Sequence, residues 1–292
     1  MRFGFIAELR HSYPVALLCK VMRVSRSGFY DYLKRVQRQP SAGEVEARRL
    51  LAEIKAIHEE SRKRYGSPRV HAELERRGLR CSLSKVKRLM RREGIYALLE
   101  RKYRRRKSVL TLAQTTNLLS PEPNISRANQ VWYSDITYVR TAEGWLYLAA
   151  VMDAYSKRIV GYALAEHMRT DLVIQALRMA AKQRHLTKGL IHHSDKGSQY
   201  TSYTYQRELS RWGIRASFTG TGACLDNAYI ESFFATLKKE LIYRTKFVTR
   251  ERAELAVVEF INMYYNSWRL HSSLGYQSPN DFEAETLERL AA

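Results

Sequence analysis

The chain has 292 residues, of which 45% are hydrophobic and 27% are charged, a balance typical of a folded, soluble protein. Its 50 Lys and Arg residues against 29 Asp and Glu residues give a net charge of +21, so the expected partner is a polyanion. No apolar run approaches the roughly 20 residues that span a membrane, and the three cysteines form no C-x-x-C pair. We therefore expect a cytoplasmic or nucleoid-associated protein without a structural zinc finger.

The positive charge is concentrated in the N-terminal part of the chain. Residues 1–128 contain 30 Lys and Arg against 12 Asp and Glu, a net charge of +18, whereas residues 129–292 contain 20 against 17, a net charge of +3. This division predicts that the N-terminal part contacts nucleic acid. A basic surface that serves only solubility is the alternative.

Two short helices are expected near the N-terminus, in a segment assigned to residues 1–40. The first covers Pro14–Met22, with proline in its first turn, and the second covers Arg26–Arg35 after Ser25, a suitable N-cap. A tight joint before a helix with basic, small and aromatic residues is typical of a helix-turn-helix. This interpretation makes Arg26 a DNA contact; a purely structural hairpin is the alternative.

A second helical unit is expected over residues 41–100. A helix at Glu44–Glu60 precedes one that begins near Tyr65 and ends at Gly78, and Ser82 caps a third at 83–92. Basic side chains surround this third helix and acids that could pair with them are nearly absent, which favours phosphate contacts. The residues expected to contact DNA are Lys85, Lys87, Arg88, Arg91 and Arg92.

Residues 101–128 are expected to form a basic linker. Its dense run Arg101–Lys107 includes Arg104, Arg105 and Arg106. Such a tether would follow the phosphates of bound DNA and steepen the salt dependence of binding. A solvated tether without DNA contacts is the alternative.

From residue 129 to residue 245 short strands alternate with helices. Short joints between the first three strands predict antiparallel neighbours, and two later strands follow helices, as parallel crossovers require. The expected strands cover 131–139, 145–152, 158–164, 190–194 and 214–218, and the expected helices cover 171–183, 201–212 and the segment around Glu231. The predicted fold is a mixed α/β domain, followed at 246–292 by a helical extension, with a helix at 250–265, that packs on this core.

Three acids occupy unusual places in this pattern. Asp135 lies in the middle of an aromatic and β-branched strand, where burial is costly unless a positive group is bound. Asp195 closes a short apolar run before Gly197, as at the carboxyl end of a buried strand. Glu231 lies at the edge of the apolar stripe of a helix, and Lys238 lies two turns further along that edge. The carboxylates predict a metal site, beside which Lys238 either holds a DNA phosphate or is solvated.

Other polar residues nearby are assigned structural roles. Asp153 is interpreted as a turn residue and Asp226 as the N-cap of the Glu231 helix. His192 and His193 are neighbours on a strand, so their side chains point to opposite faces and form no metal-binding pair. His193 either lines the site or supports the strand.

The acids and their flanking motifs resemble a known family. Asp195 and Glu231 have 35 residues between them, with Asp135 upstream, and resemble the Asp-Asp-(35)-Glu pattern of the retroviral-integrase superfamily. The flanking motifs narrow the resemblance, over roughly residues 1–285, to insertion-sequence transposases of the insertion sequence three family and to their second-reading-frame product. These motifs are His193–Tyr200, Asp226–Ala228, Glu231–Phe234, Arg269–Tyr276 and Ser278–Pro279.

The resemblance implies a DDE-type transposase with a ribonuclease H-like fold that cuts and joins DNA by phosphoryl transfer to water or to a DNA 3′-hydroxyl. It implies two Mg²⁺ ions, which Mn²⁺ can replace, with Asp135 bridging both ions, Asp195 completing one and Glu231 the other. It also implies element ends and target DNA as partners, a homo-oligomer on DNA, and an upstream reading-frame product fused to or associated with this chain.

Two other functions explain part of the sequence. A helix-turn-helix transcription regulator accounts for residues 1–100 but gives no reason for the three acids. A structure-selective nuclease would cut DNA without joining it, and fold alone does not separate it from a transposase. The expected helices at 26–35 and 83–92 offer Arg and Lys but no Asn or Gln for adenine, so we expect the chain alone to bind DNA with little sequence preference.

Overall fold

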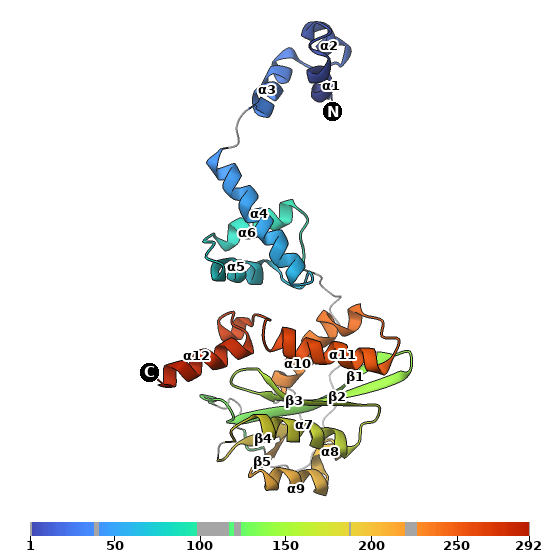
Figure 1. Cartoon of the computed structure of the whole chain (residues 1–292), viewed down its shortest axis with the longest axis vertical. Helices are drawn as coiled ribbons and strands as arrows, with labels where there is room; N and C mark the ends of the chain where they lie inside the picture. Colours follow the sequence, from blue (N-terminus) through green and yellow to red (C-terminus); the bar gives the residue numbers. More distant parts are fainter. Residues whose placement is uncertain are drawn as a thin grey trace. The chain divides into compact units, whose positions relative to one another are not determined.

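The computed structural model describes residues 2–37, 41–97, 117–119, 124–186, 188–219 and 227–291 (Figure 1). The chain divides into two units, Met1–Tyr96 and Ala97–Ala292. The linker residues predicted to contact DNA, Arg104, Arg105 and Arg106, lie outside the described residues. Within the described part of the chain, no helix combines the length and the apolar character that crossing a membrane requires.

The first unit is helical. Helices α1 (Arg2–Leu9), α2 (Val15–Val21) and α3 (Arg26–Gln37) enclose a small apolar cluster of Ile6, Leu18, Cys19 and Phe29. The next group consists of α4 (Ala42–Glu60), α5 (Ser67–Arg76) and α6 (Leu83–Arg92). Ser82 accepts a hydrogen bond from the Lys85 backbone N–H at the start of α6, so the predicted N-cap is present.

The second unit is built on a mixed five-stranded sheet with the order β3-β2-β1-β4-β5. The first three strands are antiparallel neighbours, and β4 and β5 continue the sheet in parallel with β1. This topology confirms the predicted mixed sheet. The strands are β1 (Val131–Thr141), β2 (Gly144–Asp153), β3 (Ile159–Ala165), β4 (Ile191–Ser194) and β5 (Arg215–Phe218).

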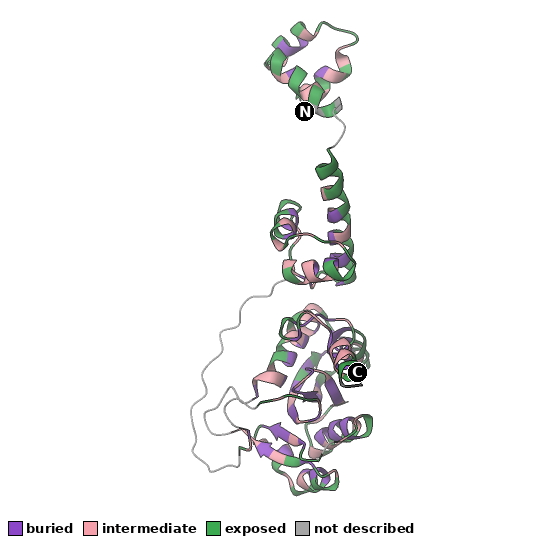
Figure 2. Ribbon diagram, turned by 90° about the vertical axis from the view of Figure 1, so that its left-hand side faces the viewer, coloured by how far each residue is buried: buried purple, intermediate pink, exposed green. Residues whose placement is uncertain are grey.

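Helices cover both faces of this sheet, and the buried residues lie between sheet and helices (Figures 1 and 2). Helices α10 (Ala228–Glu240) and α11 (Arg250–Glu259) pack on one face, against Tyr133 and Val139 of β1. Helix α7 (Thr170–Gln183) packs on the other face, against Trp132, as the alternation along a strand requires. At β3 the approach is so close that a Cβ on Gly161 would lie 2.3 Å from the Ala176 carbonyl oxygen, which explains the glycine.

Two helices differ from their predicted extents. The helix predicted at 201–212 is divided at Ser202, whose extended backbone separates α8 (Ser198–Thr201) from α9 (Tyr203–Arg211) and whose hydroxyl caps α9. The helix predicted at 250–265 changes after Glu259 into the π-helix η2 (Phe260–Tyr265). The remaining elements are the 3₁₀ helices η1 (Ile242–Arg244) and η3 (Ser272–Leu274) and helix α12 (Pro279–Ala291).

Candidate active site

The strand register brings Asp135 and Asp195 to neighbouring positions. The parallel pairing of β1 with β4 ends at Ser134 and Ser194, and each aspartate is the next residue of its chain. Beyond this point β1 continues to Thr141 with β2 as its sheet neighbour. The two carboxylates therefore lie where the carboxyl end of β4 leaves the sheet, a position that suits a binding site.

Glu231 approaches the same region from helix α10. The apolar stripe of this helix is buried against the sheet, and Glu231 is half-buried at its margin. The charges of Asp195 and of Glu231 both act on Asp135. The structure thus brings the three predicted carboxylates into one electrostatic neighbourhood.

Asp135 is held in an environment that disfavours its charge. Burial, reinforced by the charges of Asp195 and Glu231, raises the pKa of Asp135 to about 7. The backbone N–H of Ile136, which donates to Asp135 Oδ1 at 2.7 Å, and the Lys238 ammonium act in the opposite direction without balancing these effects. A carboxyl group perturbed by burial and by like charges is typical of functional sites.

The three carboxylates form an open set rather than a closed cluster. Among the residues that the structure describes, no group of three or more His, Cys, Asp or Glu side chains lies close enough to share a metal ion. The charges of the three carboxylates interact, but their oxygen atoms do not converge on one point.

The loop after β4 positions Asp195. The backbone N–H of Gly197 donates to Asp195 Oδ1 at 3.0 Å. A Cβ added to Gly197 would lie 3.0 Å from that same oxygen and 3.0 Å from Gln199 Oε1. The carboxylate of Asp195 therefore lies directly against the backbone of Gly197, which a larger residue would crowd. The predicted turn at Gly197 thus helps to place the Asp195 side chain.

The two histidines of β4 support the strand from opposite faces. His192 is fully buried, contacts the Tyr205 hydroxyl at 2.9 Å, and has its pKa lowered to about 3 by burial and by His193. His193 lies 2.9 Å from the Ser217 hydroxyl and packs edge-on against Tyr133. Because His192 is neutral and hydrogen-bonded and His193 packs against Tyr133, both histidines have the environment of structural residues.

A tyrosine stack connects β1 to α10. The rings of Tyr133 and Tyr229 are nearly parallel, with centroids 4.8 Å apart and planes 4° apart. Tyr133 precedes Asp135 by two residues, and Tyr229 precedes Glu231 by two residues. The stack therefore fixes the spacing of the two elements that carry these acids. The sequence analysis missed it, although the matching offset of both tyrosines was visible.

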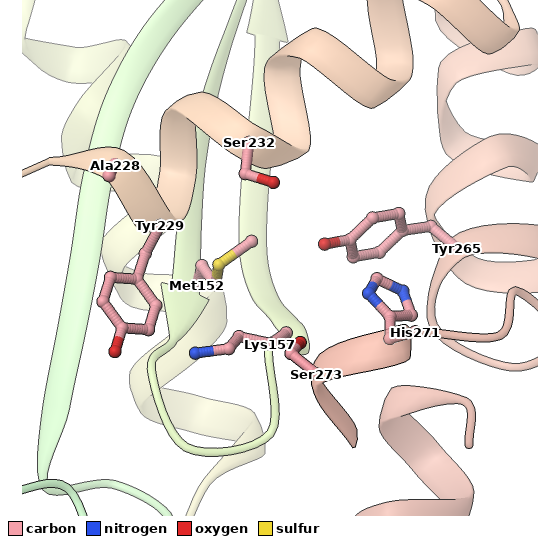
Figure 3. A pocket seen from close by; sticks show the side chains of 8 residues that line it. All are labelled: Met152, Lys157, Ala228, Tyr229, Ser232, Tyr265, His271 and Ser273. Carbon is pink, nitrogen blue, oxygen red and sulfur yellow. The ribbon is translucent and has the colours of Figure 1, made fainter. Parts of the chain in front are cut away.

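A pocket of about 250 Å³ adjoins the start of α10 (Figure 3). The Lys157 ammonium lies 3.6 Å from the centroid of the Tyr229 ring, and burial lowers the pKa of Lys157 to about 8. Ser232, the residue after Glu231, and the Tyr265 hydroxyl also line the pocket. This lysine supports the tyrosine stack from the side that faces away from Tyr133.

Lys238 lies close to the carboxylates but is not ion-paired with them. It is half-buried on α10, with Nζ 5.1 Å from the centroid of the Tyr138 ring. Burial lowers the pKa of Lys238, whereas the charge of Asp135 raises it. An ammonium in this position is available to a phosphate next to the acids.

The basic residues predicted to bind DNA are mostly exposed in the first unit. Arg26 is exposed on α3, and Lys87, Arg88, Arg91 and Arg92 are exposed on α6. Lys85 differs, because its ammonium contacts Glu46 at 2.7 Å. The sequence analysis considered only acids near this helix, and the partner comes from α4.

The structure also shows the roles of Asp153, of the N-cap of α10 and of Arg269. Asp153 is fully buried and accepts the backbone N–H groups of Asn129, at 2.6 Å, and Tyr155, at 2.9 Å, so it closes a turn. Helix α10 has Asn227 at its N-cap position, while Asp226, the predicted N-cap, lies outside the described residues. Arg269, the first residue of the motif Arg269–Tyr276, is buried and paired with Glu240 at 3.1 Å.

Protein-family models match both parts of the chain. The integrase core domain matches residues 125–224, a second model of an integrase core domain matches residues 212–279, and an HTH-like domain matches residues 46–103.

Two relatives match nearly the whole chain. The transposase InsF for insertion sequence IS3A of Escherichia coli strain K12 is 37% identical over 292 residues, which cover 98% of this chain and 100% of the relative. A 31 kDa protein of insertion element IS600 from Shigella sonnei is 40% identical over 276 residues, which cover 94% of this chain and 100% of the relative. Among solved structures, the HTLV-2 integrase catalytic core domain in complex with magnesium matches with a TM-score of 0.43 and 13% identity, over 57% of this chain and 99% of that one.

Proposed function

Because the chain belongs to the IS3 family of insertion-sequence transposases, we propose that Asp135, Asp195 and Glu231 are its catalytic carboxylates. As a member of this family the chain is a DNA transposase catalytic subunit, a polynucleotidyl transferase of the DDE type. The observation that supports the assignment is that Asp135 and Asp195, which follow the last paired residues of β1 and β4, lie near Glu231 of α10. The charges of Asp195 and Glu231 raise the pKa of Asp135.

The donor set fits divalent metal ions. Mg²⁺ prefers oxygen ligands and is usually held by one or two carboxylates together with substrate phosphate, so the oxygen atoms of three neighbouring carboxylates and of a DNA phosphate suit it. Asp135 would contribute to both ions of a pair, Asp195 to one and Glu231 to the other, with Mn²⁺ as a substitute. Two ions, when bound, would activate the attacking oxygen and stabilise the leaving oxygen of an in-line displacement.

The residues of the chain then have distinct tasks. The Gly197 N–H holds Asp195, and the Tyr133–Tyr229 stack keeps Glu231 at a fixed distance from Asp135. Lys238 would hold a phosphate of the DNA beside them. With water as nucleophile the phosphodiester is hydrolysed; with a DNA 3′-hydroxyl as nucleophile a new phosphodiester forms while the bond from phosphorus to the target's 3′-oxygen breaks, and that 3′-oxygen leaves as a hydroxyl.

Strand joining is the activity that tests this proposal. The full chain is incubated with a pre-cut element-end oligonucleotide, target DNA and Mg²⁺, and joined products are measured. We expect Asp135→Asn, Asp195→Asn and Glu231→Gln to abolish joining and cutting while DNA affinity persists. Asp171→Asn is the matched control, since this aspartate is exposed on α7 and has only His167 as a 3.8 Å neighbour.

The assay has two outcomes that contradict the proposal. Retention of more than a few per cent of joining by any of the three variants would remove that residue from the catalytic set. Metal-dependent cutting without joining by the unmodified chain would favour the structure-selective nuclease over the strand-transfer activity proposed for these carboxylates.

We further propose that the basic helices of residues 1–100 bind DNA phosphates, a role supported by the HTH-like match and by the exposed cations of α6. Loss of each phosphate contact is expected to reduce the salt slope of binding by about 0.9. In the full chain, Lys87→Ala with Arg88→Ala is compared with Lys85→Ala, whose ammonium is already paired with Glu46. Equal salt slopes for all variants would contradict phosphate contact by α6.

End recognition is proposed to need an additional module in a homo-oligomer on DNA, supplied by fusion to an upstream reading-frame product. The support is the lack of Asn and Gln on α6 and the predominance of Arg and Lys there. The isolated chain is expected to prefer element-end over scrambled DNA only weakly at about 0.15 M salt. A preference beyond roughly a hundredfold in a competition assay, within the range of specific binders, would show that no further module is needed.

A further inference from the structure

A second groove, of about 590 Å³, lies next to Lys238 in the catalytic unit. It runs between the β1–β2 hairpin and the segment that follows α10. No acidic side chain lines it. Its aromatic and basic lining residues are Tyr138, Trp145, Tyr243, Arg140, Lys238 and Lys246.

The sheet topology creates this groove. Strand β4 pairs with β1 only as far as Ser134, so the rest of β1 has an edge that no neighbouring strand covers. The far end is closed where Thr141 bridges to Phe247 and the Ala142 N–H donates to the Phe247 carbonyl at 3.0 Å. The groove therefore begins beside the catalytic acids and ends at this bridge.

The aromatic side chains of the groove are unusually accessible. Tyr138 is 53% exposed, Trp145 44% and Tyr243 62%, although aromatic residues of this size are normally covered. Tyr138 and Trp145 pack edge to face, with centroids 5.0 Å apart and planes at 82°. This contact holds two rings in a fixed arrangement at the surface.

The charge of the groove has one sign. Within the described residues neither Arg140 nor Lys246 makes an ion pair, and both are exposed. Lys238 joins them from α10 and interacts electrostatically with Asp135. A positively charged path thus leads from the catalytic carboxylates along exposed aromatic rings, and it complements a polyanion that also presents flat apolar surfaces.

We propose that this groove binds an unpaired DNA segment next to the reacting phosphate, with bases stacked on Tyr138, Trp145 and Tyr243 and phosphates held by the neighbouring cations. The inference rests on the proposed function, since it places DNA at the carboxylates. Exposed rings combined with cations are the means by which proteins hold single strands, because unpaired bases offer their faces for stacking. Paired bases offer no such faces, so the groove distinguishes an opened strand from an intact duplex.

Trp145 provides a local probe for this binding. The full chain is titrated in EDTA, where no catalysis occurs, with a short single-stranded oligonucleotide and with the matching duplex, and tryptophan fluorescence is followed. We expect quenching by the single strand that disappears in Trp145→Phe. In Tyr138→Ala and Tyr243→Ala the oligonucleotide concentration for half-maximal quenching should rise about fivefold or more. Tyr203→Ala is the matched control, because Tyr203 is 79% exposed on α9 and does not line the groove.

Photocrosslinking identifies the contact directly. A single strand with one 5-iodouracil is expected to crosslink to Tyr138, Trp145 or Tyr243 and not to Tyr203. Equal quenching by duplex, quenching that survives Trp145→Phe, or crosslinks confined to residues outside the groove would each overturn the proposal. Neither measurement requires catalysis. If the three carboxylate variants are inactive in the joining assay but the groove does not bind the single strand, the groove proposal is refuted and the catalytic assignment stands.

Discussion

Two aspartates on adjacent strands, the fully buried Asp153 of β2 and the half-buried Asp135 of β1, show how differently one sheet accommodates a carboxylate. Asp153 accepts three backbone N–H groups, from Asn129, Tyr155 and Ser156. The guanidinium of Arg184 lies 3.6 Å from it. Asp135 accepts one backbone N–H at 2.7 Å and has two further acids as electrostatic neighbours.

The difference lies in what compensates burial. Burial raises the pKa of both groups, but N–H donors and Arg184 oppose the shift at Asp153, whereas Asp195 and Glu231 add to it at Asp135. A fold can stabilise a buried carboxylate with its own donors, as it does at Asp153. At Asp135 the Ile136 N–H and the Lys238 ammonium oppose the shift without balancing it, as expected for the proposed metal ligand.

Exchange of each carboxylate for an amide should separate the two roles most strongly. Asp135→Asn removes a metal ligand that contributes several kcal/mol of transition-state stabilisation, so strand joining should fall by about 10³-fold or more. Asp153→Asn should lower the melting temperature while joining per folded molecule persists. Joining and thermal unfolding are measured for both variants. Loss of joining in folded Asp153→Asn would contradict a purely structural role of Asp153. Retention of joining in Asp135→Asn would contradict a catalytic role of Asp135.

The network around Asp153 should matter for stability alone. Arg184 donates to both oxygens of Glu283 on α12, at 2.7 and 2.8 Å, and Arg158 donates to the same carboxylate at 2.8 Å. Glu283→Gln leaves two half-buried guanidinium groups without the buried carboxylate that pairs with both and should cost about 3 kcal/mol of unfolding free energy. Glu285→Gln on the same helix, which affects exposed contacts with Arg289 and Gln277, should have a much smaller effect because the group is exposed to solvent. Equal losses in denaturant unfolding would show that burial of the pair is unimportant.

The pH dependence of stability should distinguish the Asp135 site. Its folded-state pKa of about 7 lies above the ordinary aspartate pKa of 3.8, so between these two pH values the folded state holds a proton that the unfolded state releases. Stability from this group therefore decreases as pH rises from about 4 to 7. In EDTA the decrease, discounted for partial exposure, should be about 2 kcal/mol and should vanish in Asp135→Asn.

The same stability measurement can be repeated with Mg²⁺ in place of EDTA. Because the ion binds the folded state at the ionised carboxylates, it should raise the stability of the unmodified chain at pH 8 and have little effect on Asp135→Asn. If the stability of the unmodified chain and that of Asp135→Asn change with pH in parallel in EDTA, the pKa of Asp135 is not raised as proposed.

The sequence was sufficient for features that depend on local patterns. The alternation along 131–139 predicted β1, and the apolar stripe around Glu231 predicted α10 with its acid at the margin. Asp195 followed from a short strand that ends before a glycine. The strand order and register that place Asp135 beside Asp195 came from the structure, because the crossover rule gives the handedness of a connection and not its register.

Features that depend on distant segments were not predictable in this way. Arg184 and Glu283 are 99 residues apart, and no local pattern indicates that they pair. The groove beside Lys238 combines the β1–β2 hairpin with residues 242–247, and its aromatic residues read locally as ordinary strand residues. The boundary at Ser202 is a different case: serine is a preferred N-cap, but its capping role here depends on its extended backbone.

The smallest expected effect concerns how accurately Asp195 is held. Gly197 has φ −54°, which alanine adopts without strain, so Gly197→Ala tests only the contact of the new Cβ, 3.0 Å from Asp195 Oδ1. The carboxylate must move by a few tenths of an ångström, and joining should fall about three- to tenfold, since catalysis is sensitive to small displacements. The melting temperature should change little. Gly213→Ala is the opposite control: with φ +66° and no atom within 4 Å of the new Cβ, it should cost about 1 kcal/mol of stability and leave joining unchanged. If Gly197→Ala joins DNA at the unmodified rate, the close approach of backbone and carboxylate at this turn has no part in placing Asp195.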